Sequence, residues 1–369
     1  MKNKLCIILI LSMLFSVYSE ENNAYQVLIL GDIHYDNPEF HQKEAPSKAL
    51  RKERIRNYEM WEGPSCELLK SAGKRAKAES CAFAIQMGDI AQGDADTPEL
   101  LGKMLEKSFR TVKSYFPNIP LLAVKGNHDI RGYQKTIQRP ADNVLMELVA
   151  KEIGTGKGSS WIFRKGKDLY IGVDGFRPEK QCIAFVKKAL LNNPETRYVF
   201  LVTHLPVIPA TIHSPFWNLP GNFEIADLLE KRKAVILAGH THSLSITTRK
   251  TRNGKLVQLV STSLGRDWLS GKKMQPSLDW TSVRDAVRKS VRGMNAEKIQ
   301  RKLETLDSKG EYSTRIYTRI SGYVILKICD ERVEAKIYTG EEKPSLREIL
   351  VENRTENPLA KLDTSALHK

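Results

Sequence analysis

The sequence predicts an α/β fold in which buried strands alternate with amphipathic helices. Short apolar runs bounded by turn residues recur along the chain and predict strands at 25–30, 81–87, 119–124, 168–173, 197–202 and 233–238. Apolar residues at helical spacing lie between several of these runs and predict helices at 98–116, 179–193 and 224–232. This alternation is typical of α/β or layered α-β-α architectures.

The first strand follows an N-terminal segment with the pattern of a secretory signal. Lys2 and Lys4 precede an apolar run at 5–17, and the small residue Ser19 follows it. This run is too short for a comfortable transmembrane helix, and the sequence has no other apolar stretch long enough to cross a bilayer. We therefore expect residues 1–19 to be a signal peptide and the soluble mature protein to be exported, to the periplasm or the extracellular space. An uncleaved membrane anchor is the alternative.

Segment 37–75, after the first strand, is long and polar and contains the charged run KALRKERIR. We interpret it as a surface helix or loop inserted after that strand. The helix at 98–116 is better defined, because Leu101, Met104 and Leu105 begin a series of apolar residues at near-helical spacing.

The C-terminal part shows three different patterns. Residues 276–310 are charged and helical in pattern, and we interpret them as a second insertion. Residues 321–340 predict two strands with a turn near Asp330. Residues 346–369 show no strong pattern and are expected to form a tail. No Pro/Gly/Ser-rich linker divides the chain, so we expect one domain over 20–345 that carries both insertions.

The composition limits the class of protein. Hydrophobic residues make up 41% of the chain, which excludes global disorder. Removing Lys2 and Lys4 with the signal lowers the formal net charge from +15 to +13. Such a charge favours anionic partners, namely nucleic acid, anionic lipid or phosphorylated small molecules. A solvated basic surface is the simpler explanation, because the sequence shows no aromatic-interleaved RNA motif and no zinc finger.

The cysteines give little information. Four remain once the signal is removed, and none lies in a C-x-x-C motif, which argues against a thiolate zinc site. An oxidising compartment permits a disulfide, but the spacing identifies no pair. The four are Cys66, Cys81, Cys182 and Cys329.

Five of the predicted strands are followed directly by Asp, Asn or His residues, in most cases just after a glycine. Catalytic and binding groups of open α/β sheets gather at the carboxyl ends of the strands, so residues distant in sequence can meet in one cleft. The glycines allow sharp turns there. The residues are Asp32 and His34, Asp89, Asn127 and His128, His204, and His240 and His242.

This combination of side chains predicts a metal site. Any one of the motifs alone is commonly an ordinary turn. Together they form a set of oxygen and nitrogen ligands without sulfur, which suits Zn, Mn or Fe better than Ca. The ligands are too many for one tetrahedral ion, and they suit two ions with a carboxylate between them.

The ordered series D-x-H, G-D, G-N-H-D, H and G-H-x-H resembles the calcineurin-like metallophosphoesterase family over roughly residues 26–265. The resemblance implies a four-layered α-β-β-α sandwich with a binuclear metal centre. By this resemblance, one metal is held by Asp32, His34, Asp89 and His242. The other is held by Asp89, Asn127, His204 and His240. Asp89 bridges the two, and His128 is similar to the family's non-ligand histidine that faces the leaving group.

The sequence departs from the family pattern in three places. Gln92 stands where the family often has Asp or Asn, which puts a supporting contact in doubt. The gap between Asp32 and Asp89 is long because of the first insertion. No tyrosine matches the metal-bound tyrosine of purple acid phosphatases, which disfavours a purple iron centre.

These features predict a metal-dependent hydrolase of phosphomonoesters or phosphodiesters with two divalent or trivalent ions. Two cations about 3.5–4 Å apart would make a bridging hydroxide available for in-line attack on phosphorus. His128 would protonate the leaving alkoxide. The expected substrates are phosphorylated small molecules, lipids or nucleotides. Arg131 and His213 are weaker candidates for substrate contacts, and Phe216 and Trp217 could stack on a base or sugar.

Two alternatives belong to other functional classes. One is a non-catalytic binding protein on the same fold, against which the complete ligand set argues. The other is a nuclease, suggested by the positive charge but disfavoured by the expected export and by the lack of a nucleic-acid module. The sequence leaves open the natural substrate, the choice between monoester and diester, the metals, the disulfide pairing and the oligomeric state.

Overall fold

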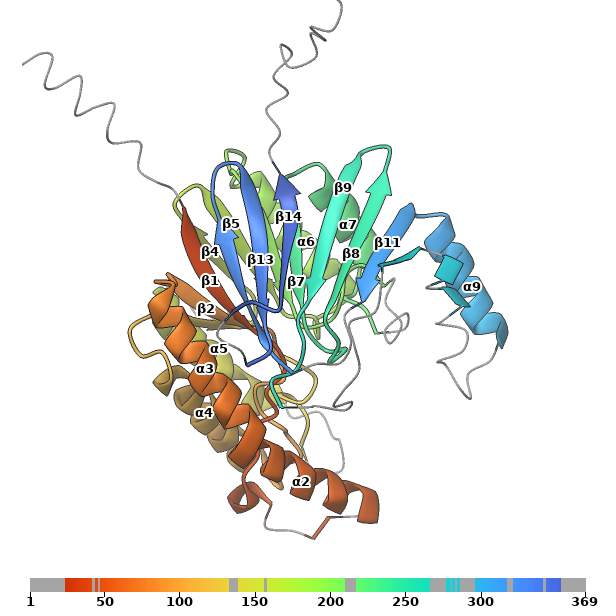
Figure 1. Cartoon of the computed structure of the whole chain (residues 1–369). Helices are drawn as coiled ribbons and strands as arrows, with labels where there is room; N and C mark the ends of the chain where they lie inside the picture. The colour runs from red at the N-terminus through yellow and green to blue at the C-terminus, as the bar shows by residue number, and fades with distance from the viewer. Residues whose placement is uncertain are drawn as a thin grey trace, which may run out of the picture.

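The computed structural model describes the chain over residues 24–41, 44–45, 47–132, 139–155, 158–209, 217–265, 277–279, 281–282, 284–285, 296–316, 321–340 and 343–352. Over these residues the chain forms two β-sheets with helices around them (Figure 1). The predicted signal peptide, His213 and Phe216 lie outside the described residues. No helix among the described residues is long and apolar enough to cross a membrane.

The first sheet has six strands. Its strands β1, β2 and β3 are parallel, and β12, β13 and β14 continue the sheet in antiparallel pairing from the other edge of β1. Their spatial order and bounds are β14 (Leu346–Glu352), β13 (Arg332–Tyr338), β12 (Tyr323–Ile328), β1 (Tyr25–Leu30), β2 (Phe83–Gln86) and β3 (Leu121–Ala123).

The second sheet has eight strands, with a parallel centre formed by β5, β6, β7 and β9. Antiparallel strands extend it on both sides. The order is β10 (Ser277–Asp279), β11 (Glu311–Ile316), β8 (Ser245–Thr251), β9 (Gly254–Val260), β7 (Ala234–Ala238), β6 (Val199–Thr203), β5 (Asp168–Val173) and β4 (Trp161–Lys165).

The sheets pack face to face, and this follows from side chains that alternate along each strand. On β5, Tyr170 points between the sheets, where its ring meets the edge of Phe83 from β2 at 5.0 Å between centroids. Its neighbours Leu169 and Ile171 belong to a second apolar core on the other face of the same sheet. Both faces of β5 are therefore covered, as its continuous apolar sequence predicts.

Helices cover the outer faces of the sheets, which gives the predicted α-β-β-α layers. Three helices lie together beside the six-stranded sheet, and α6 and α7 lie on the far side of the eight-stranded sheet (Figure 1). Their bounds are α3 (Cys66–Ala78), α4 (Pro98–Ser114), α5 (Arg139–Ile153), α6 (Glu179–Leu191) and α7 (Asn222–Glu230).

The first insertion is helical over most of its length. A short helix η1 (Pro38–Phe40) precedes α2 (Lys48–Met60), which continues through a π-turn η2 (Trp61–Ser65) into α3. The interpretation as a surface helix fits α2 better than α3. Helix α3 is part of a core layer, because Leu69 and Ala72 on one of its faces are completely buried. Charged residues interspersed along α3, such as Lys70 and Lys74, mask that apolar face in the sequence.

Several elements were not predicted from the sequence. These are α5, β4, β8, β9, β10, β11 and β14. Strand β14 begins at Leu346, where the sequence suggested the start of a tail, because the edge of β13 supplies a pairing partner that the sequence alone does not show. Helix α9 (Ala296–Asp307) lies within the charged segment predicted to be helical, and Leu303 buries its apolar face.

The four described cysteines form no disulfide with one another. Cys66, Cys81, Cys182 and Cys329 are all free, so none of the disulfides permitted by an oxidising compartment is formed.

Candidate metal centre

All seven predicted metal ligands lie at the carboxyl ends of strands, and they come from both sheets. The six-stranded sheet contributes the residues after β1, β2 and β3, and the eight-stranded sheet those after β6 and β7. In chain order the residues are Asp32, His34, Asp89, Asn127, His204, His240 and His242. The layered fold therefore brings together groups that the sequence separates widely.

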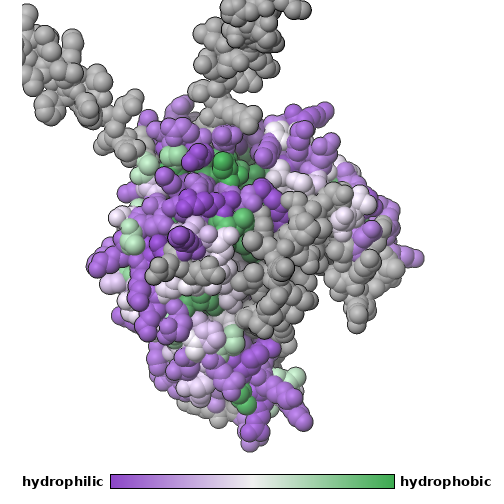
Figure 2. Space-filling model, in the orientation of Figure 1, coloured by the Kyte–Doolittle hydropathy of each residue, from purple (hydrophilic) through white to green (hydrophobic). Residues whose placement is uncertain are grey.

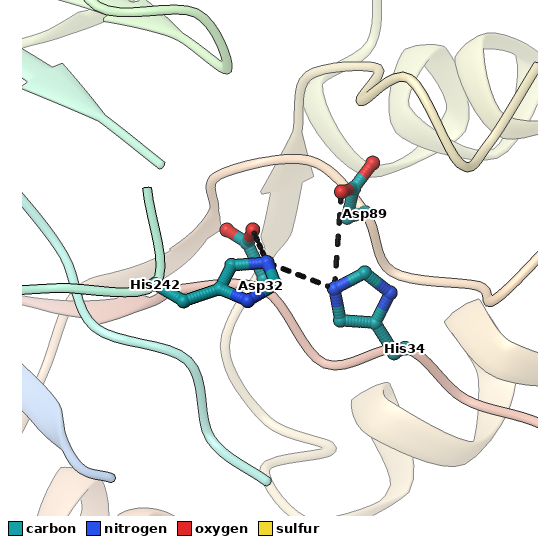
Figure 3. A group of neighbouring side chains, drawn as sticks. All are labelled: Asp32, His34, Asp89 and His242. Carbon is teal, nitrogen blue, oxygen red and sulfur yellow. Dashed lines mark hydrogen bonds and ion pairs between the residues drawn. The ribbon is translucent and has the colours of Figure 1, made fainter. Parts of the chain in front are cut away.

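The first group of side chains contains Asp32, His34, Asp89 and His242, whose ligand atoms all lie within 4.8 Å of one another (Figure 3). The Nε2 atoms of His34 and His242 are 3.1 Å apart. His242 Nε2 lies 2.8 Å from Asp32 Oδ2, and His34 Nε2 lies 3.8 Å from Asp89 Oδ2. Two carboxylates and two imidazoles thus point toward a common space.

The second group shares Asp89 with the first and adds His204 and His240. Asp89 Oδ2 lies 3.5 Å from His204 Nε2. The side-chain oxygen of Asn127 completes the group, at 3.0 Å from His204 Nε2 and 2.9 Å from His240 Nδ1. Asp89 is therefore placed between two sets of nitrogen and oxygen atoms, as a bridging carboxylate would be.

The protonation of this cluster suits cation binding. His204 Nδ1 lies 2.9 Å from the carbonyl oxygen of Met87, which can only accept, so Nδ1 carries the proton and Nε2 presents a lone pair. Burial and the neighbouring His204 lower the pKa of His240 to about 3, so its imidazole is neutral at pH 7. Burial works against ionisation of Asp32, but His242, His204 and His240 hold its pKa below the ordinary range. Neutral imidazoles and an ionised carboxylate are the forms that bind metal ions.

The backbone is strained at four of these residues. His34, Asp89, His240 and His242 have φ between 50° and 71°, in the left-handed region that non-glycine residues rarely adopt. Each such residue costs on the order of 1–3 kcal/mol and persists only where the surroundings enforce it. Gly126 is required for a different reason, because a Cβ at this position would lie 2.1 Å from Asp89 Oδ1.

His128 lies beside the first group of ligands but is not a member of it. Its Nδ1 donates to the carbonyl oxygen of Gln92 at 2.7 Å, which leaves Nε2 as the atom that can exchange a proton. Its ring meets that of His34 edge to face at 4.5 Å between centroids, and its backbone N–H donates to Asp89 Oδ1 at 2.7 Å. The contact from position 92 uses the backbone, so the Gln in place of Asp or Asn does not remove it.

Asp129 fixes the turn that carries Asn127 and His128. Its carboxylate accepts hydrogen bonds from the backbone N–H groups of Gly126, at 2.8 Å, and Ala91, at 3.0 Å. Burial, together with the charge of Asp89, raises the pKa of Asp129 to about 7. This residue therefore joins the loops after β2 and β3.

Arg131 is held by acidic groups of the protein. Its guanidinium bonds Asp94 at 2.5 Å and lies 3.6 Å from Glu53 on α2. Arg54 of α2 donates to the backbone oxygen of Asp94 at 3.1 Å. The first insertion is therefore tied to the loops that carry Asp89 and His128. The predicted phosphate contact through Arg131 would have to compete with Asp94.

One buried ion pair near the site was not anticipated. Lys125 Nζ lies 2.9 Å from Asp174 Oδ2, and both side chains are almost completely buried. Lys125 follows β3 and Asp174 follows β5, so the pair joins the two sheets next to Asn127. The sequence offered one indication of this pair, namely a lysine that directly follows the apolar run LLAV.

The layered fold and the paired groups of ligands define a metallophosphoesterase-type protein. A family model for calcineurin-like phosphoesterases matches residues 15–244, more than half of the chain. The chain belongs to the calcineurin-like phosphoesterase family, which confirms the resemblance seen in the motifs. A search of curated proteins gave no match.

Three solved structures share the fold at low sequence identity. GAP50, described as the anchor in the inner membrane complex of Plasmodium, aligns with a TM-score of 0.54 at 11% identity, over 90% of each chain. PhoD aligns at 0.52 and 11%, over 88% of this chain and 68% of its own. A dimetal phosphatase from Danio rerio aligns at 0.51 and 13%, over 89% and 99%. At such identities the likeness establishes the fold alone.

Proposed function

We propose that this protein is a phosphoester hydrolase that works with two metal ions. The observation that carries the proposal is the pair of ligand groups that share Asp89. Asp32, His34 and His242 would hold one ion with Asp89. The remaining ligands, Asn127, His204 and His240, would hold the other. When bound, two such ions supply a water of lowered pKa and stabilise negative charge on the phosphoryl oxygens.

His128 is the residue we assign to proton transfer. Its Nδ1–H is engaged by the carbonyl oxygen of Gln92, so proton transfer to a leaving oxygen would use Nε2. Its side chain is largely buried beside His34. Asp89 accepts the backbone N–H of His128, so the same carboxylate that would bridge the ions also fixes the position of the proton donor.

Arg131 has a supporting role in this proposal. Its bonds to Asp94 and Glu53 hold α2 over the catalytic loops, so we assign it to positioning rather than to phosphate binding. We also propose that the protein is exported, on the strength of the N-terminal pattern alone. Mass spectrometry of the protein from its native host would show an N-terminus near residue 20 if the signal is cleaved.

The function is tested by metal analysis combined with hydrolysis assays. The protein, stripped with a chelator and reloaded with Mn, Zn or Fe, should take up two ions per chain and hydrolyse p-nitrophenyl phosphate or bis-p-nitrophenyl phosphate in a metal-dependent manner. Uptake without hydrolysis of any ester in a broad panel would indicate a non-catalytic binding protein. Steeply salt-dependent DNA binding and cleavage would indicate a nuclease.

A further inference from the structure

Trp217 is an exposed aromatic residue beside the candidate metal centre. Its side chain is 61% exposed, although large aromatic side chains are usually well buried in folded proteins. Its ring lies 5.8 Å from that of His240 between centroids, with 48° between the planes. The surface seen in Figure 2 is largely hydrophilic, with hydrophobic residues in small separate patches. An exposed indole beside a candidate metal ligand is therefore an unusual feature of this surface.

The backbone near Trp217 is firmly anchored. Leu219, two residues later, is buried and its N–H donates to the carbonyl oxygen of Pro206 at 3.0 Å. Asn222 Nδ2 donates to the carbonyl oxygen of Val207 at 2.9 Å. These two contacts hold the residues that follow Trp217 against the segment that follows His204.

Trp217 and His128 lie beside different ligand groups. His128 contacts His34 of the first group, and Trp217 contacts His240 of the second. A phosphorus atom bound between the groups would have one ester oxygen toward His128, where the leaving group is protonated. A second ester substituent would extend toward Trp217. An indole face recognises planar rings by stacking, with little dependence on other features of the ring.

We infer that Trp217 determines specificity by stacking on the retained group of a phosphodiester, and that this retained group carries a planar aromatic ring, as in an aryl or nucleoside ester. The inference rests on the proposed function, because it assumes that phosphorus is bound between the two ligand groups. It narrows the substrate class from phosphoesters in general to diesters with an aromatic group on the side that does not leave.

The experiment keeps the leaving group constant and changes the retained group. Phenyl p-nitrophenyl phosphate, thymidine 5′-p-nitrophenyl phosphate and methyl p-nitrophenyl phosphate all release p-nitrophenol. Wild-type kcat/KM should be about 5- to 150-fold higher for an aromatic ester than for the methyl ester.

Trp217→Ala should lose this preference with little change in kcat/KM for the methyl ester, and Trp217→Phe should keep part of the preference. The phenyl and thymidine esters distinguish aryl from nucleoside substrates. Leu191→Ala, which removes a 70% exposed apolar side chain on α6, should keep the wild-type ratio.

A ratio unchanged in Trp217→Ala, or an equal loss on aromatic and methyl esters, would overturn the inference. So would a wild-type preference for p-nitrophenyl phosphate over every diester. Calorimetric binding of phenylphosphonate and methylphosphonate gives a readout independent of turnover. If no ester is hydrolysed with any metal, the proposed function fails. The phosphonates then still decide on Trp217: a preference for phenylphosphonate that Trp217→Ala removes supports stacking, and no preference refutes it.

Discussion

Buried carboxylates lie at both ends of the central strands, but their hydrogen-bond partners differ. At the amino end, the buried Asp168 carboxylate receives both Nε and a terminal nitrogen of Arg197, at 2.9 and 2.5 Å. Tyr25 Oη donates to it at 2.7 Å and the Tyr198 N–H at 3.1 Å. At the carboxyl end, the carboxylates of Asp32 and Asp89 face imidazole nitrogens, some of which lie 3.1 Å from one another.

This difference separates a structural cluster from a functional one. Asp168 has a full set of donors from the protein, so nothing further is needed to stabilise its charge. In the ligand groups, imidazole nitrogens and carboxylate oxygens lie close together, and most of these atoms are hydrogen-bond acceptors. A proton on one imidazole nitrogen can bond only one of its neighbours, so lone pairs on the other atoms still face one another and repel. Strained backbone at four residues adds to this cost. A cation between these atoms would accept all of their lone pairs at once. We therefore expect substitutions at the amino end to lower stability and substitutions at the carboxyl end to lower activity.

The largest effect is expected for Asp89→Asn. A neutral amide bridges two cations poorly, so metal content should fall and hydrolysis should drop below detection. Elemental analysis and an ester assay measure both quantities. Glu67→Gln, on an exposed side chain of α3, is the control and should retain both. Full activity in Asp89→Asn would disprove the assignment of a bridging carboxylate.

His128→Ala should separate proton transfer from metal binding. Hydrolysis of alkyl phosphates should slow by about 10²- to 10⁴-fold, the usual loss for a general acid. With p-nitrophenol as the leaving group, which departs without protonation, the loss should be much smaller. Metal content should remain near that of the wild type. Equal losses on the two kinds of ester, or loss of a metal ion, would show that the role is misassigned.

Arg197→Ala should damage the opposite end of the strands. It leaves the completely buried Asp168 without its cationic partner, so the free energy of unfolding should fall by about 3–5 kcal/mol. Urea denaturation measures this change. Lys70→Ala, which breaks an exposed pair with Glu67, should change stability by less than about 0.5 kcal/mol. If Arg197→Ala also lowered the metal content, the structural cluster at the amino end of the strands and the ligand groups at the carboxyl end would not be independent.

Metal removal should have a smaller effect on stability. Binding to the folded state adds about 1.4 kcal/mol for each ion at a free metal concentration about ten times its Kd, so two ions add about 2.8 kcal/mol. Unfolding with and without chelator should therefore differ by about this amount in the wild type and in Arg197→Ala. The difference should disappear in Asp89→Asn. A metal effect that survives in Asp89→Asn would place the bound ions elsewhere.

The sequence predicted the parallel strands other than β9, and the positions of the candidate ligands, because both depend on local patterns. Apolar runs such as 199–203 are buried on both faces, and the polar residues after them converge because of the sheet topology. Strands such as β8, with the sequence SITTRKT, were missed because pairing with β9 and β11, rather than an apolar run, makes them strands.

Hydrogen bonds from the candidate site residues to backbone atoms could not be predicted from the sequence either. The carbonyl oxygens of Gln92 and Met87 orient His128 and His204, and any residue at those positions carries such an oxygen. The environment of Arg131 depends on the insertion, which brings Glu53 to it from far along the chain. Side-chain type therefore indicated the candidate ligands, whereas their orientation depends on the completed fold.

Both ligand groups draw on both sheets, and this has a consequence for the order of events during synthesis. Asp32, His34, Asp89 and Asn127 belong to the half of the chain that emerges first, whereas His204, His240 and His242 emerge much later. Domains fold as units while the chain is extruded from its N-terminus. A nascent chain that ends before β7 lacks one ligand of each group, His242 of the first and His240 of the second. Metal capture would therefore coincide with docking of the second sheet, and a truncated chain would compete poorly for the ions.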